Sequence, residues 1–228
     1  SPYFGVKGEI KSVEDAVIRV LGFDLVINLA LGLALGRTLS VPKEGPNGYA
    51  PFWQQAVMTA ALMGELARLM PAKQRPNTGT AYLCGLLHNF GYLILGHVFP
   101  PQFSLVNRHI EANAHINRSL IEKHLMGLSR EQVSSLLMQQ WHMPEDVIVA
   151  LRSQHNPNYD GDFSTCANLL YVAVRSLRGR GFGDGPWEEP NDEVFERLGI
   201  SAEAAHNVTE TLLEKIDDLG ELIQMLNK

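Results

Sequence analysis

Residues 84–91 read Cys-Gly-Leu-Leu-His-Asn-Phe-Gly, and this stretch decides how the whole chain is interpreted. It lies in an apolar run that predicts one helix from residue 81 to residue 95. A His beside an Asp on such a helix binds divalent metals, because an imidazole nitrogen and a carboxylate oxygen converge on one ion. The second position here is Asn89, whose neutral amide oxygen is a much weaker ligand. The motif around His88 therefore predicts a metal site that lacks one charge.

The rest of the chain has the same helical pattern. Apolar residues recur at helical spacing, and Gly, Pro, Ser and Asn residues mark the ends of the segments. No segment alternates apolar and polar residues convincingly with a period of two. We therefore predict an all-α fold, a compact multi-helix bundle. Helices are expected over residues 13–21, 25–39, 52–70, 81–95, 103–114, 116–125, 130–141, 145 to 153 or 154, 165–177, 191–198 and 202–226.

Composition narrows the class of protein. The 228 residues carry a net charge of −6 without a run of Lys or Arg, which argues against direct binding of nucleic acid. The most apolar stretch, residues 20–35, contains Asp24 and Asn28 and is too short to span a bilayer, so no membrane association is expected. Cys84 and Cys166 form no disulfide framework, which favours a reducing cytoplasm.

Several motifs, taken in order, resemble the HDOD family of bacterial signalling domains, which are related to the HD metal-dependent phosphohydrolases. The stretch GLLHNFGYLIL from residue 85 resembles the family signature Gly-Leu-Leu-His-Asp-Ile-Gly-Lys-Leu-Leu. Residues 1–35, the aromatic pair Phe52-Trp53 and the Trp-x-x-Pro segment of residues 141–152 resemble further parts of the family pattern. The likeness extends to about residue 157. Helices precede this pattern in the family, so we expect the sequence to begin partway through a larger protein.

The departures from the family pattern concern the metal ligands. Where the family commonly has a His, this chain has Gln55, and where the family has an Asp, it has Asn89. A third position, often a His in the family, is Arg130 here. An arginine cannot coordinate a cation. HDOD proteins are generally taken to lack hydrolase activity, and the resemblance implies that this chain is further from activity than most.

We therefore predict a non-catalytic cytoplasmic signalling domain with no catalytic residue, metal or cofactor of its own. Its expected partners are other signalling proteins or domains, and a small anionic ligand is a further candidate because Arg152 and His155 suit phosphate or carboxylate. The alternative for these two residues is a structural role, because cationic side chains are favourable at a helix C-terminus. The candidate residues of the vestigial pocket are Gln55, His88, Asn89, Arg152 and His155.

Three alternatives stay open. A degenerate metal-dependent phosphohydrolase would bind a divalent metal through Asn89 with Glu122 or His155. His88 and Cys84, four residues apart, could be half of a zinc site, although a buried His that is hydrogen-bonded within the core is favoured. A purely structural oligomerisation module is the third alternative.

Other residues are assigned by their surroundings. Trp53 and Trp141 are expected in the core, whereas Trp187 is expected in a Gly-rich loop, where it contacts a partner or packs on the core. His109, His115 and His124 are interpreted as solvated surface residues. The predicted organisation is an HDOD-like domain over residues 1–178, a loop over 179–190 and a C-terminal helical pair over 191–228 that packs on the same domain.

Overall fold

The computed structural model describes residues 52–183 and 188–214. The helices expected over residues 13–21 and 25–39, Trp187 and the part of the last expected helix beyond residue 214 lie outside these ranges. Within them all regular structure is helical, which confirms the all-α fold class. The helices are α3 (Phe52–Leu69), α4 (Thr78–Leu87), α5 (Phe90–Val98), α6 (Pro100–Ala112), α7 (Arg118–Met126), α8 (Arg130–Gln140), α9 (Glu145–Ser153), α10 (Ser164–Arg178), α11 (Asp192–Leu198) and α12 (Ala202–Glu214).

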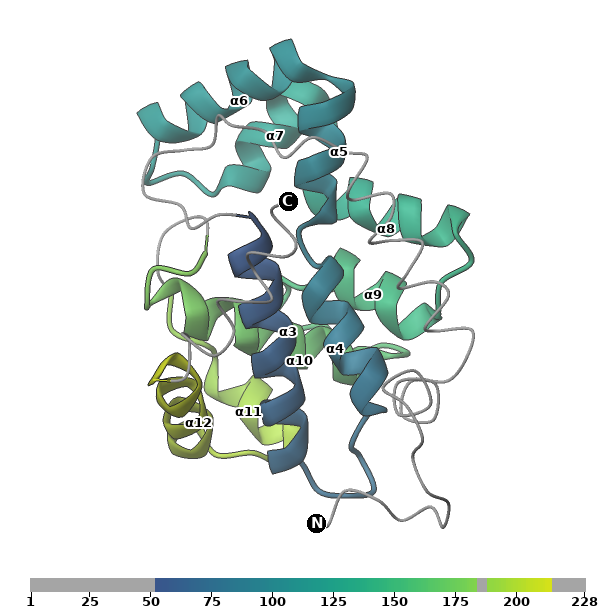
Figure 1. The fold of residues 1–228 in the computed structure, drawn as a ribbon, viewed down its shortest axis with the longest axis vertical. Coiled ribbons are helices and arrows are strands. Elements are labelled where there is room, and N and C mark those ends of the chain that lie inside the picture. Colours follow the sequence, from purple (N-terminus) through teal and green to yellow (C-terminus); the bar gives the residue numbers. More distant parts are fainter. Residues whose placement is uncertain (1–51, 184–187, 215–228) are drawn as a thin grey trace, which may run out of the picture.

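The core is built around α3, which packs against α4, α10 and α12. Figure 1 shows α3 and α4 side by side and antiparallel, joined at the lower end of the view. Gly85 allows this close approach, because a Cβ at this position would lie 2.5 Å from the Ala60 Cα. Trp53 is 3% exposed and anchors this core, as predicted, and Trp141 is partly buried against it.

The remaining helices extend the bundle at both ends. In Figure 1, α6 and α7 form the upper end of the molecule, while α11 and α12 lie at the opposite end. The α11 and α12 helices pack against α10, and α12 also packs on α3. Among the helices of residues 52–183 and 188–214, none has both the length and the apolar character needed to cross a bilayer.

Most helix boundaries follow the predicted signals. Ser129 and Gln132 form the capping box that starts α8, and Gly199 ends α11 in the left-handed conformation. The helix expected over residues 103–114 begins earlier, at Pro100. Pro100 and Pro101 lie in its first turn, where proline is tolerated because the first backbone N–H groups have no partner within the helix.

Candidate functional site

The expected helix over residues 81–95 is interrupted at His88 and Asn89, so the prediction of a single helix was wrong. The structure has α4 ending at Leu87 and α5 starting at Phe90. The His88 ring explains the break, because its Nδ1 lies 2.7 Å from the Gly85 carbonyl oxygen. In an unbroken helix the N–H of Asn89 would bond that carbonyl. Both side chains of the motif therefore lie at a break between two helices.

Asn89 occupies the N-cap position of α5, but its side chain makes no capping hydrogen bond. The residue is 5% exposed, and its Oδ1 atom is buried without a hydrogen-bond partner. A buried amide oxygen without a partner is costly, so it marks this position as strained or as open to a ligand. The oxygen is neutral and can only accept.

The antiparallel pair α3 and α4 brings Gln55 to the level of this break. Gly85 contacts α3 at Thr59 and Ala60. Gln55 lies one turn from Thr59 and His88 nearly one turn from Gly85, both towards the upper end of the pair in Figure 1. Both side chains are buried. The tertiary structure thus places three of the predicted residues, Gln55, His88 and Asn89, at one end of the α3–α4 pair.

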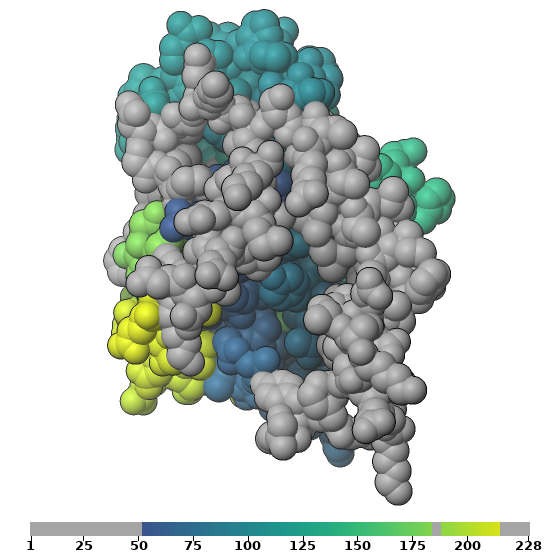
Figure 2. Space-filling model, in the orientation of Figure 1, coloured from purple at the N-terminus to yellow at the C-terminus, as the bar shows by residue number. Residues whose placement is uncertain are grey.

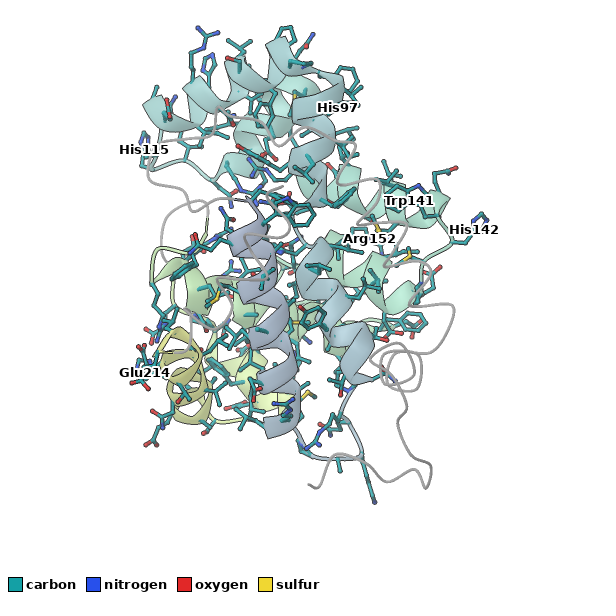
Figure 3. The ribbon with its side chains drawn as sticks, in the orientation of Figure 1. His97, His115, Trp141, His142, Arg152 and Glu214 are labelled. Carbon is teal, nitrogen blue, oxygen red and sulfur yellow. The ribbon has the colours of Figure 1, made fainter. Side chains whose placement is uncertain are left out.

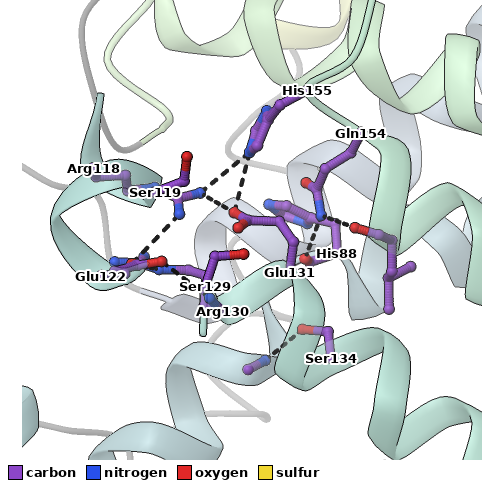
Figure 4. A network of polar contacts seen from close by, with 12 residues as sticks. His88, Arg118, Ser119, Glu122, Ser129, Arg130, Glu131, Ser134, Gln154 and His155 are labelled. Atoms are coloured by element: carbon purple, nitrogen blue, oxygen red, sulfur yellow. Dashed lines mark hydrogen bonds and ion pairs between the residues drawn. The ribbon is translucent and has the colours of Figure 1, made fainter. Parts of the chain in front are cut away.

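Four charged residues form a buried cluster between α7 and α8, shown in Figure 4. Arg130 donates from Nε to Glu122 Oε1 over 2.6 Å and from its backbone N–H to Oε2 over 3.0 Å. Arg118 lies with Nη2 2.6 Å from Glu131 Oε1. We name Arg118, Glu122, Arg130 and Glu131 the arginine–glutamate cluster. It contains two positive and two negative charges and is electrically balanced.

His155 extends this cluster towards the break at residue 88. Its Nε2 lies 3.1 Å from Glu131 Oε1 and 3.3 Å from Arg118 Nη2, while its Nδ1 is buried without a hydrogen-bond partner. The neighbouring Gln154 donates from Nε2 to the His88 carbonyl oxygen over 3.0 Å. Consecutive residues after α9 therefore contact both the cluster and the His88 backbone (Figure 4).

Burial and charge set the protonation of this pair. Burial would raise the pKa of Glu131, but the Arg118 guanidinium and the His155 hydrogen bond outweigh it and hold this pKa well below its usual range. Burial lowers the pKa of His155, although the Glu131 carboxylate acts in the opposite direction. At neutral pH Glu131 is therefore ionised and His155 neutral, with Nε2–H donating to Glu131 and Nδ1 left as an acceptor.

Arg152 is not part of this arrangement. It is exposed on α9, and the arginine within hydrogen-bonding distance of His155 is Arg118. Sequence reasoning missed Arg118, Glu131 and Gln154. The spacing of Arg118 and Glu122 by four residues on one helix face was a detectable signal of pairing. Nothing local pointed to the contact between Glu131 and His155, which are 24 residues apart.

Cys84 lies next to Cys166. A hydrogen bond with the Cys166 thiol and burial raise the pKa of Cys84 well above its usual value. Its Sγ also lies 3.9 Å from the Asp146 carbonyl oxygen. A metal ligand must be a thiolate, and these surroundings favour the neutral thiol. The geometry therefore lends no support to a zinc site at Cys84 and His88.

The side chains in the described ranges do not fit a divalent metal. No group of three or more His, Cys, Asp or Glu side chains there has a geometry that could hold an ion. Glu122 and Glu131 are the buried carboxylates nearest to His155, and both are ion-paired with arginines. The fold and the site together define an all-helical domain whose polar centre is neutralised by arginine side chains.

Comparison with known proteins identifies the family. The model of the HDOD domain matches residues 1–157, and the chain belongs to the HDOD domain family. A crystal structure from Marinobacter aquaeolei VT8, described as a "Putative signal transduction protein", is 46% identical with a TM-score of 0.84. The match covers 97% of this chain and 49% of that chain.

The chain is also similar to more distant proteins. A crystal structure from Shewanella amazonensis SB2B, described as a "Putative phosphohydrolase", is 20% identical with a TM-score of 0.67 and matches 96% of this chain and 78% of that one. A protein of Treponema pallidum (strain Nichols) is 24% identical over 217 residues, which are 94% of this chain and 40% of that protein. The chain thus spans about half or less of the length of the Marinobacter and Treponema proteins.

Proposed function

We propose that this HDOD domain is a non-catalytic signal-transduction domain of a bacterial cytoplasmic protein, and that it acts by binding other signalling proteins or domains. The observation that carries the proposal is the neutralisation of Glu122 by Arg130 and of Glu131 by Arg118. The description of the Marinobacter relative as a signal transduction protein supports it. The free, adjacent thiols of Cys84 and Cys166 agree with a reducing compartment.

A metal would have to compete with the arginine–glutamate cluster. Separating one partner of a buried ion pair typically costs about 3–5 kcal/mol, because the remaining charge is left unpaired. A cation that took Glu122 would leave the Arg130 guanidinium, which is 2% exposed, without its carboxylate. Asn89 supplies no negative charge in compensation. These costs favour a binding role over the alternative of a degenerate phosphohydrolase.

A small ligand is a second element of the proposal. Two buried acceptor atoms near the helix break, the Asn89 Oδ1 and the His155 Nδ1, have no hydrogen-bond partner. A ligand that fills these positions would therefore present N–H or O–H donors. The anionic ligand predicted from Arg152 and His155 is less favoured, because Arg152 is exposed and the buried arginines have carboxylate partners.

Metal analysis of the purified chain tests the non-catalytic proposal. The chain is loaded with Mn²⁺ or Fe²⁺, freed of excess ion, and assayed for bound metal and for hydrolysis of bis-p-nitrophenyl phosphate. We expect substoichiometric metal and no metal-dependent hydrolysis. The matched variants are His88→Ala and, as an exposed control, His124→Ala. Stoichiometric metal together with hydrolysis that His88→Ala abolishes and His124→Ala preserves would overturn the proposal.

Light scattering separates signalling by partner binding from a purely structural oligomerisation module. We expect the isolated chain to be a monodisperse monomer over a wide concentration range. A stable closed oligomer would favour the structural module.

A further inference from the structure

The helices α6 and α7 contain the same short pattern. Residues 105–109 of α6 are Leu-Val-Asn-Arg-His, and residues 120–124 of α7 are Leu-Ile-Glu-Lys-His. Each pattern consists of a leucine, a β-branched residue, a polar residue, a basic residue and a histidine. The patterns lie in two successive helices that pack against each other.

The two patterns match in burial at four of their five positions; the second position is buried as Val106 and partly buried as Ile121. The third position, Asn107 or Glu122, is buried. The first, fourth and fifth positions are exposed in both helices, and they lie at the spacing that aligns side chains on one helix face. In α6 and in α7 the exposed stripe thus begins with a leucine and ends with a basic residue and a histidine. We name these six residues the Leu-basic-His surface: Leu105, Arg108, His109, Leu120, Lys123 and His124.

Exposed apolar side chains are concentrated in this part of the molecule. Eight large hydrophobic residues are exposed in the described ranges, and five of them lie between residues 98 and 120. Leu120 is the most exposed of the eight, at 60%, and the exposed Ile116 lies four residues before it, just ahead of α7. Figure 2 shows the teal atoms of this region at the upper end of the molecule. Exposed apolar side chains gathered in one segment are a feature of protein interaction sites.

The charge of this end differs from that of the chain as a whole. The chain carries a net charge of −6. On α6 and α7, however, two basic side chains, Arg108 and Lys123, are exposed, against one exposed carboxylate, that of Glu111. Four of the eight histidines are exposed in this region: His97, His109, His115 and His124. Figure 3 shows His97 and His115 at this end, with Glu214 on the opposite part of the molecule. The surface is therefore apolar and basic in an otherwise acidic chain.

We infer that the Leu-basic-His surface is a docking site for an acidic amphipathic helix of a partner protein. Leu105 and Leu120 contact the apolar face of that helix, and Arg108 and Lys123 pair with its carboxylates. The inference deepens the proposed function, on which it rests, by naming the surface and the chemistry of the partner. Charge complementarity of this kind orients partners and excludes wrong ones.

The charges also argue against a second copy of this chain as the occupant. A symmetric dimer through this surface would place Arg108 and Lys123 of one copy near the same residues of the other. Like charges that face each other across an interface are unfavourable. A partner with an acidic helix provides the opposite charge.

The probe is a synthetic 18-residue helix with leucines on one face and glutamates on the other, labelled with a fluorophore. Its matched control has every glutamate replaced by lysine. Binding to the 228-residue chain is measured by fluorescence anisotropy at low and high salt. We expect the glutamate peptide to bind at least tenfold more tightly than the lysine peptide, and to weaken as salt screens the charges.

Variants locate the site. Leu120→Ser and Lys123→Glu are each expected to weaken binding of the glutamate peptide about tenfold, a typical effect at an interface contact. Leu136→Ser is the matched control, because Leu136 is 52% exposed on α8, outside the proposed surface. All three positions are on the surface, and circular dichroism melts confirm that the variants are folded. We expect Leu136→Ser to bind as the parent chain does.

Several results would overturn the inference. These are equal binding of the two peptides, unchanged binding by Leu120→Ser and Lys123→Glu, or binding of anionic lipid vesicles with no binding of the glutamate peptide. Each of these leaves the metal and hydrolysis assays unaffected, so failure of this docking site is distinguishable from failure of the proposed non-catalytic function.

Discussion

The Arg130 guanidinium donates to the Glu122 carboxylate over 2.6 Å, and both side chains are almost completely buried. The guanidinium carbon also lies 5.0 Å from the centre of the Tyr92 ring on α5. One arginine on α8 therefore contacts α7 through its charge and α5 through a cation–π interaction. Through Arg130, the arginine–glutamate cluster joins α7 at the upper end of the molecule to α8 and α5.

Breaking this ion pair should destabilise the fold. Arg130→Met removes the guanidinium from Glu122 and leaves it the backbone N–H of residue 130 at 3.0 Å and the longer 3.5 Å ion pair with Arg118. We expect a loss of about 3 kcal/mol in the free energy of unfolding. The double variant Arg130→Met with Glu122→Leu removes both charges and should recover most of this loss. Urea denaturation measures both. A double variant that is less stable than either single variant would show that the pair is not the source of the effect.

Gly91 should not tolerate a side chain. A Cβ at this position would lie 2.0 Å from the Arg130 carbonyl oxygen, and the Gly91 N–H donates to Ser134 Oγ over 2.6 Å. Gly91→Ala would push α5 away from α8, and we expect a loss of about 1–3 kcal/mol in unfolding free energy, the usual range for overpacking. Gly64→Ala in α3 is the matched control, because a Cβ there meets no atom within 4 Å. It should be neutral or stabilising, and equal effects of the two variants would contradict the close contact.

Acidification should weaken the fold through His155. Because its pKa is lowered in the folded state, the unfolded chain takes up the proton first, and stability declines as the pH falls below the ordinary value of 6.5. The lowered pKa of Glu131 adds a further loss at lower pH, below its ordinary value of 4.5. Thermal melts between about pH 8 and pH 5 should show the first decline in the parent chain and in the exposed control His109→Gln. His155→Gln should show a smaller slope, and an identical slope would refute this assignment.

Restoring the carboxylate at residue 89 should not restore a metal site. Asn89→Asp places an ion at a position that is 5% exposed and has no partner for Oδ1, so its folded-state pKa is expected to rise. The variant should then be destabilised increasingly as the pH rises above about 4, the ordinary value for Asp. Melting temperatures with and without Mn²⁺ test this, with the exposed Asn207→Asp as control. A rise in melting temperature on addition of Mn²⁺ that is specific to Asn89→Asp would indicate a latent metal site.

The sequence predicted the helical fold because the signals involved are local. Apolar spacing and caps such as Ser129 act within a few residues, and in the described ranges most helices lie close to the expected places. The break at residues 88 and 89 was missed, because the apolar pattern continues through it. A hydrogen bond from a ring to a carbonyl three residues earlier changes the backbone without changing that pattern.

The candidate site was only partly predictable. His88, Asn89 and Gln55 came from a family pattern, and the tertiary structure places them at one end of the α3–α4 pair. Arg152 was named from its position in the chain beside His155, but it lies on an exposed face of α9. The angular position of a side chain on a helix decides which residues it contacts. Arg152 lies on α9 and His155 lies beyond its end, so closeness in the chain does not bring the two side chains together.

By itself, the sequence determined the helical class and most of the helices of the described ranges, since these depend on residue type and local spacing. The absence of ligand residues at positions 55, 89 and 130 is what the family resemblance implies. The tertiary structure alone decided which charges meet. Arg118 and Glu131 are 13 positions apart and the contact from Glu131 to His155 spans 24, so their pairing depends on how α7, α8 and the end of α9 pack. Burial then gives these pairs their strength, because charges removed from water must find partners within the fold.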